Sequence, residues 1–217
     1  MCGRFSFSYT EKFIEENYQV EVDVSSYKPR YNCAPSQNIA VISNENLKKL
    51  SFYRWGLIPF WAKDMSIGNK IINAKAETIL EKPSFKQSFK SKRCLVLADS
   101  FYEWKHDKEK IPYRILMKDK RPFAMAGIWD KWKDAEGKEI NSFSIITTEA
   151  NELIKEIHQR MPVILPRSEE KNWLEISDTK FLSSLLHPYN PDEMEAYPIS
   201  KLVNSPVNDS PEIHKRM

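Results

Sequence analysis

Apolar residues follow two periods along this chain, and each period predicts its own kind of element. Alternating or continuous apolar runs bounded by charged or turn-forming residues are typical of strands. Such runs occupy residues 39–43, 47–55, 93–98, 101–105, 112–117, 123–132, 140–147 and 161–165. A spacing of three to four residues predicts helices at 10–19, capped by Thr10, at 149–158, and after Ser168 and Asp178. Glycine and proline interrupt residues 56–61, which predicts a surface loop there.

Strands outnumber helices through the middle of the chain, and neither an internal repeat nor a linker divides it. Charged turns between successive strands indicate an antiparallel meander. We therefore expect a single α+β domain over residues 1–217, in which a strongly curved or barrel-like antiparallel sheet carries peripheral helices. The polar, proline-bearing tail at residues 204–217 is expected to be loosely held.

Composition narrows the class of protein. The 217 residues are 41% hydrophobic and 12% aromatic, which is enough for a packed core. The three cysteines lack a C-x-x-C spacing and the four histidines are scattered, so we expect no disulfide framework, no metal and no organic cofactor. A reducing compartment follows, and we expect a cytoplasmic monomer. No apolar run approaches the roughly 20 residues that span a bilayer, so no membrane span is expected.

Charge alone does not identify a partner. Thirty-three basic and thirty acidic residues give a formal net charge of +3, which is too even to indicate an anionic ligand. Lys82, Lys86 and Lys90 share one face of a predicted helix, with Lys92 and Arg93 directly after them. This stripe is either a solvated helix face or a phosphate contact.

Cys2 carries the most distinctive chemistry in the sequence. Removal of Met1 gives Cys2 an α-amine of pKa ~7.7–8.0 beside a thiol of pKa ~8.5, so both groups are nucleophiles near neutral pH. The amine attacks an aldehyde to give an imine, and the thiolate closes on the same carbon to form a thiazolidine. Two alternatives stay open. In the first, Cys2 is only a small second residue, of the kind that allows Met1 to be trimmed. In the second, Cys2 is the nucleophile of an N-terminal-nucleophile amide hydrolase.

Six segments together carry a family resemblance. They are, in order, MCGRF at residues 1–5, YNCAP at 31–35, RWGLIP at 54–59, INAKAET at 72–78, FYEWK at 101–105 and HQRMP at 158–162. In residue type, order and spacing the chain resembles the SRAP family, the SOS-response-associated peptidase-type proteins, from Cys2 to about Pro166. The resemblance implies a DNA damage response protein that shields abasic sites in single-stranded DNA. It would do so through a covalent crosslink between Cys2 and the ring-opened deoxyribose.

The resemblance also implies roles for other residues. By the motif matches, the active site comprises Cys2, Asn73, Glu103 and His158, and the phosphate contacts are Arg4, Lys75 and Arg160. The family commonly has arginine where Lys75 stands, and lysine keeps the charge without the planar fork of a guanidinium. The family's name records a second activity, removal of Met1 by the protein's own peptidase action, and a lyase-type activity is a further expectation.

The residue types suit these roles. Glu103 lies between aromatic neighbours, where desolvation would raise its pKa and let it accept a proton from the Cys2 amine or thiol. His158 at a helix C-terminus would be cationic and would protonate the sugar oxygen as the ring opens. Asn73 both donates and accepts hydrogen bonds. Each residue also has an ordinary interpretation. Glu103 would be a solvated strand glutamate, His158 a helix-end histidine hydrogen-bonded to backbone carbonyls, and Asn73 a turn residue.

Aromatic residues add a means of binding unpaired bases. Trp61 and Trp104 are predicted stacking platforms, Pro35 a wedge beside the lesion, and the other four tryptophans core residues. Two competing hypotheses remain. One is a cysteine amide hydrolase or autopeptidase, and the other is a noncovalent single-strand binding module in which Cys2 is incidental.

Overall fold

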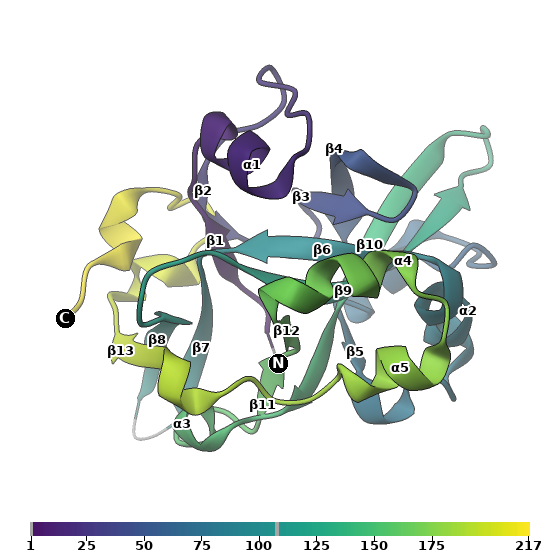
Figure 1. Cartoon of the computed structure of the whole chain (residues 1–217). Helices are drawn as coiled ribbons and strands as arrows, with labels where there is room; N and C mark the ends of the chain where they lie inside the picture. Colours follow the sequence, from purple (N-terminus) through teal and green to yellow (C-terminus); the bar gives the residue numbers. More distant parts are fainter. Residues whose placement is uncertain (1, 107–108) are drawn as a thin grey trace.

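A closed five-stranded barrel forms the centre of the molecule (Figure 1). The computed structural model describes residues 2–106 and 109–217. The strand order round the barrel is β10 (Glu139–Glu149), β4 (Asn46–Trp55), β3 (Asn38–Ser43), β6 (Arg93–Ala98) and β9 (Phe123–Lys133). Each strand pairs with the next, and β9 pairs with β10, which closes the ring. The predicted barrel-like sheet is confirmed. It is mixed rather than wholly antiparallel, because β10 runs parallel to β4.

Three short strands extend the barrel where β10 and β9 separate. Residues 139–145 of β10 pair with β9, and residues 147–149 continue alongside β11 (Arg160–Pro162). On its other side β10 runs parallel to β5 (Asn73–Lys75), and β12 (Ile164–Leu165) pairs with β9. The expected single strand at 161–165 is therefore two strands on different partners. This arrangement brings β5 and β11 to the same end of β10.

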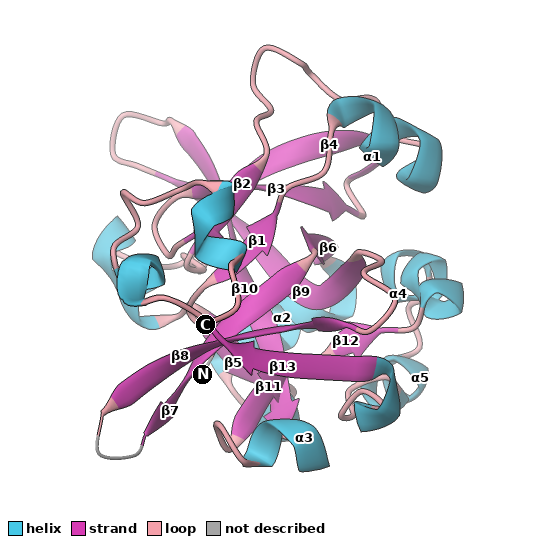
Figure 2. Cartoon of the chain, turned by 90° about the vertical axis from the view of Figure 1, so that its left-hand side faces the viewer, coloured by secondary structure: helices cyan, strands magenta, loops and turns pink. Residues whose placement is uncertain are grey.

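A second, antiparallel sheet of five strands packs beside the barrel. Its order is β13 (Met194–Pro198), β8 (Lys110–Met117), β7 (Ser100–His106), β1 (Phe5–Phe7) and β2 (Arg30–Cys33). Figure 2 shows β7 and β8 as a long hairpin beside β13. Asp99 joins β6 of the barrel to β7 and accepts hydrogen bonds from the Ser8 backbone N–H (2.6 Å) and hydroxyl (2.8 Å). The N-terminal strand is thus fixed at the junction of the two sheets.

The helices lie at the periphery, as predicted (Figure 1). They are α1 (Glu11–Tyr18), α2 (Pro83–Ser91), α3 (Glu152–Lys155), α4 (Glu170–Glu175) and α5 (Thr179–Ser184). Thr10 caps α1 and Asp178 caps α5, each through its side chain. The predicted helix at 149–158 is too long, because β10 continues to Glu149. The side chain of Asn151 accepts a hydrogen bond from the Ile154 N–H (3.0 Å) and so starts α3 late. None of the helices in the described ranges is long and apolar enough for a bilayer crossing.

Two details of the core differ from the sequence prediction. Arg93 does not belong to a surface stripe: it is 2% exposed and donates to the carbonyls of Trp173 (2.6 Å) and Ile176 (2.6 Å). The segment 56–61 is only partly a surface loop, because Leu57 and Ile58 are fully buried. Four tryptophans pack in the core as predicted, namely Trp55, Trp129, Trp132 and Trp173.

The C-terminal tail is held by specific contacts rather than loosely. The Asp209 carboxylate accepts hydrogen bonds from the backbone N–H groups of Tyr31 (2.6 Å) and Asn32 (3.0 Å) and pairs with Arg30. His214 Nε2 lies 3.0 Å from the Tyr102 hydroxyl. Polar composition predicted mobility here, but these polar groups have fixed partners on β2 and β7 that the sequence pattern does not reveal.

Candidate active site

The N-terminal strand places Cys2 between the two sheets. In β1, Phe5 lies opposite Cys33 of β2 and Phe101 of β7, and the Tyr102 N–H donates to the Arg4 carbonyl (2.9 Å). Cys2 packs in the same apolar cluster as Phe5 and is 0% exposed. Pairing of β1 with β7 therefore brings the start of the chain beside the strand that carries Glu103.

Asn73 contacts Cys2 directly. It begins β5, opposite Ile145 of the parallel neighbour β10, and its Nδ2 donates to the Cys2 carbonyl oxygen at 2.9 Å. Asn73 Oδ1 is buried and accepts no hydrogen bond from any described residue. The amide thus fixes the Cys2 backbone with one end and keeps an acceptor at the other.

Glu103 and His158 share an electrostatic environment with Cys2. Glu103 is 3% exposed, and this burial raises its pKa, while the charge of nearby His158 acts in the opposite direction. Burial also raises the pKa of the Cys2 thiol above its usual range, and the Glu103 carboxylate raises it further. The thiol is consequently protonated near neutral pH in this environment.

His158 lies between α3 and β11, just beyond the last turn of the helix. Its backbone N–H donates to the Ile154 carbonyl (2.8 Å), and its Nδ1 lies 3.0 Å from the Arg160 backbone nitrogen. The same Nδ1 lies 3.2 Å from the Arg160 carbonyl oxygen, so it accepts from the Arg160 N–H or donates to that carbonyl according to which ring nitrogen carries the proton. The Arg160 backbone orients the ring in either case.

Of the predicted phosphate contacts, Arg160 already forms an ion pair, whereas Lys75 is exposed. Arg160 binds Glu77 with both terminal nitrogens (2.6 and 2.9 Å), and its Nη2 also donates to the Thr147 carbonyl (2.6 Å). This ion pair lowers the pKa of Glu77. Lys75 is exposed and lies opposite Thr147 in the β5–β10 pairing. Lys75 and Arg160 therefore border the same edge of the site.

Arg4 is tied to the tail. Its Nη1 donates to Asn32 Oδ1 (2.8 Å) and to the Val203 carbonyl (2.5 Å). These contacts give Arg4 a structural role that its motif match did not suggest. Its contact with a phosphate stays a prediction.

The predicted base platforms differ in exposure. Trp61 is 49% exposed beside Phe60, which is 62% exposed. Trp104 is half-buried and donates its Nε1–H to Asn204 (2.8 Å). Pro35 lies at the turn between β2 and β3 and is also half-buried. Trp61 is thus the tryptophan most available to a base.

Gly56 shapes the loop that carries Trp61. Its φ is +123°, and a Cβ there would lie 2.5 Å from the Gly68 carbonyl oxygen, so a side chain is excluded at this close approach.

Sequence reasoning did not single out three residues next to the site. Asn32 and Glu77 lie within the quoted motifs YNCAP and INAKAET, so their place in a motif was the available signal. Thr147 ends an apolar run of β10, and nothing in that run distinguishes it. Among residues 2–106 and 109–217, no three His, Cys, Asp or Glu side chains are grouped so as to hold a metal ion.

Comparison with known proteins gives consistent similarities. The sequence matches the model of the family described as SOS response associated peptidase (SRAP) over residues 1–206. It is 52% identical to the abasic site processing protein YoqW of Bacillus subtilis (strain 168), over 98% of each chain. It is 33% identical to the abasic site processing protein HMCES of Xenopus tropicalis, over 88% of this chain and 67% of that protein. An X-ray structure of a protein from Bacteroides thetaiotaomicron has a TM-score of 0.91 at 36% identity, over 100% of both chains.

Proposed function

This chain belongs to the SOS response associated peptidase (SRAP) family, and from that membership we propose that it processes abasic sites in single-stranded DNA as part of a DNA damage response. The names of the relatives at 52% and 33% identity, both abasic site processing proteins, support this function. The finer proposal is that Cys2 crosslinks to the ring-opened deoxyribose. The observation that carries it is the hydrogen bond from Asn73 to Cys2, together with Glu103, which interacts electrostatically with both Cys2 and His158.

The proposed reaction uses the aldehyde of the abasic DNA, one water for the removal of Met1, and otherwise only groups of the chain. Hydrolysis of the Met1–Cys2 amide consumes that water, releases methionine and turns the Cys2 nitrogen into an amine. That amine attacks C1′ of the sugar aldehyde, and loss of one water gives an imine. The thiol sulfur then bonds to the same carbon, and the thiol proton moves to the nitrogen. The capture steps therefore give a thiazolidine and one water.

Burial of Cys2 determines the order of these steps. A thiol whose pKa is raised by burial is a poor first nucleophile, so the amine attacks first and the thiol traps the imine. Glu103, with its own pKa raised, accepts a proton from the ammonium and returns it as water leaves. Because Cys2 is 0% exposed, capture also requires the N-terminal residues to move enough to admit the aldehyde.

The neighbouring groups prepare the sugar. His158, in its cationic form, protonates the ring oxygen as the abasic sugar opens and is left neutral. The buried Oδ1 of Asn73 accepts a hydrogen bond from the sugar hydroxyl or the amine. Lys75 and Arg160 hold flanking phosphates, Arg160 by exchanging its Glu77 partner for a phosphate, and Trp61 stacks on an unpaired base.

Intact-mass measurement tests the crosslink. The chain without Met1, mixed with an abasic single-stranded oligonucleotide, should gain the oligonucleotide mass minus one water, on the N-terminal peptide. Cys2→Ser should give only an imine that requires borohydride for trapping, and Cys33→Ala should crosslink normally as a buried-thiol control. A heat-stable adduct with Cys2→Ala would overturn the assignment. Salt-sensitive binding without any adduct would instead favour the noncovalent module.

Removal of Met1 by the chain itself is a second candidate function. The family's description as a peptidase favours it, and the same thiol beside Glu103 and His158 would attack the Met1 carbonyl. The test is expression while methionine aminopeptidase is inhibited. If the chain processes itself, mass spectrometry will find Met1 retained in Cys2→Ala and absent from the unaltered chain. Retention in both would exclude self-processing.

A further inference from the structure

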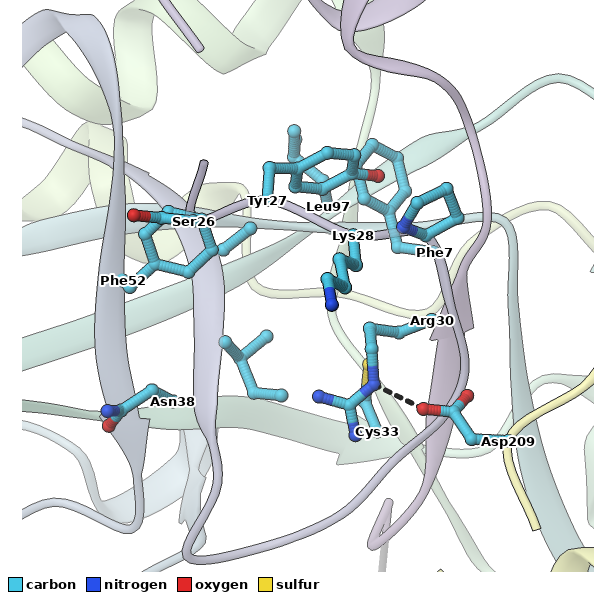
Figure 3. A pocket seen from close by; sticks show the side chains of 13 residues that line it. Phe7, Ser26, Tyr27, Lys28, Arg30, Cys33, Asn38, Phe52, Leu97 and Asp209 are labelled. Carbon is cyan, nitrogen blue, oxygen red and sulfur yellow. Dashed lines mark hydrogen bonds and ion pairs between the residues drawn. The ribbon is translucent and has the colours of Figure 1, made fainter. Parts of the chain in front are cut away.

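A cavity of about 700 Å³ lies outside the candidate active site (Figure 3). Its walls come from β1, the segment 26–30, β2, β3, β4, β6 and the tail, and Cys2, Asn73, Glu103 and His158 do not line it. The volume is within the range of pockets that hold small organic ligands. The cavity is therefore a candidate ligand site separate from the one around Cys2.

One side of the cavity is a fixed aromatic wall. Phe7 and Tyr27 are each 3% exposed and meet edge to face with ring centroids 6.3 Å apart. The Tyr27 hydroxyl donates to the Tyr9 carbonyl (2.7 Å), which holds the ring in place. Phe52 is half-buried and lines the same space from β4. A flat apolar ring fits such a wall with little cost in ordering.

The polar side of the cavity has a surplus of positive charge. Arg30 donates its Nε–H to Asp209 and its Nη2 to Gln37 Oε1 (2.9 Å), so its charge is balanced. Lys28 extends into the space above Arg30 in Figure 3, and it forms no ion pair with any residue that the structure describes. Two cations against one carboxylate leave one positive charge available to an anionic ligand.

We propose that this cavity binds a nucleotide, with the base against the wall of Tyr27 and Phe52 and the phosphate at Lys28 and Arg30. A nucleotide combines the two features that the cavity presents together, a planar ring and an anion. The Asn38 side chain, also in the lining, can hydrogen-bond a base edge. The site goes beyond the proposed crosslinking and does not depend on it.

Two sources of this ligand are distinguishable. Strands β2 and β3, which line the cavity, are joined by the turn that carries Pro35, so one source is a flanking nucleotide of a bound DNA strand. The other source is a free nucleotide. Both present the same base and phosphate.

Titration of thymidine 5′-monophosphate into the full chain tests the site. The methyl NMR signals of Ile39 and Leu97, which line the cavity, should shift and saturate, and thymidine without phosphate should bind about tenfold more weakly. Lys28→Glu should weaken nucleotide binding by about tenfold. Lys180→Glu, a charge reversal on exposed α5, should leave it unchanged. Absence of shifts at millimolar nucleotide, or equal affinity in Lys28→Glu, would overturn the proposal.

Oligothymidylates of increasing length identify the source. If a bound strand supplies the nucleotide, long oligonucleotides displace the monophosphate, and Lys28→Glu weakens their binding. If the ligand is a free nucleotide, they do not displace it. Crosslink yield at saturating abasic DNA reports on Cys2 separately, so failure of the cavity proposal and failure of the proposed function give different results.

Discussion

Asn32, in β2, links Arg4 to the C-terminal segment, and Asn32→Ala should lower the free energy of unfolding by about 3 kcal/mol. Asn32 is 0% exposed. Its Nδ2 lies within hydrogen-bond distance of the carbonyls of Val203 (3.3 Å), Ser205 (3.0 Å) and Asn208 (2.7 Å), and its Oδ1 accepts from Arg4 (2.8 Å). Two N–H groups satisfy at most two carbonyls fully. Two neutral bonds at ~0.5–1.5 kcal/mol and one charged bond at ~1.5–3 kcal/mol give about 2.5–6 kcal/mol. The loss should lie in the lower part of this range, because the carbonyls of a released tail form hydrogen bonds with water instead.

Urea unfolding followed by circular dichroism measures this change. For a chain of this size the thermal midpoint should fall by roughly 6–12 °C. Tail amides should also exchange hydrogen faster, because the loss is local as well as global. Asn17→Ala is the control: Asn17 is exposed and donates one bond to the Phe13 carbonyl (2.9 Å), so the expected change is within ~0.5 kcal/mol. A loss below about 1 kcal/mol for Asn32→Ala would refute the view that this amide anchors the tail.

Three further predictions concern single side chains. Burial raises the pKa of Glu170 to about 7 from an ordinary 4.5. The protonated carboxyl therefore contributes its full stabilisation of the fold below pH 4.5. The free energy of unfolding should fall by about 3 kcal/mol as pH rises from there through 7. Urea titrations of Glu170→Gln should lack this fall, and an unchanged pH profile would contradict it. Trp61→Ala should weaken single-strand binding by ~1–3 kcal/mol in fluorescence anisotropy with unchanged unfolding, whereas an unaltered affinity would remove Trp61 as a platform. Glu77→Gln should tighten that binding by roughly 0.5–1 kcal/mol, because Arg160 loses its competing carboxylate; weaker binding would mean that Glu77 positions Arg160.

The sequence predicts the barrel strands well because each long strand carries its own apolar pattern and charged turns. It does not predict β1, β2, β5 or β13, which are three to five residues long and exist only because a neighbouring strand pairs with them. The same limit applies to the site. The motifs indicate Cys2 and Asn73, and their contact depends on β5 lying parallel to β10, a pairing between distant segments. The engagement of Arg4 with residue 203 is equally nonlocal.

The fold bears on how a chain terminus can act as a reactive group. Terminal residues are usually poorly ordered unless they are tied down. Here Phe5 is fully buried with its ring centroid 5.1 Å from that of Trp55, and Asn73 holds the Cys2 carbonyl. In the proposed reaction, folding has therefore already placed Cys2 beside Asn73, so apart from the local movement that admits the aldehyde, less entropy is lost than for a disordered terminus. In that proposed reaction the same burial keeps the thiol protonated while the amine attacks, so the thiol acts in the second step, on the imine.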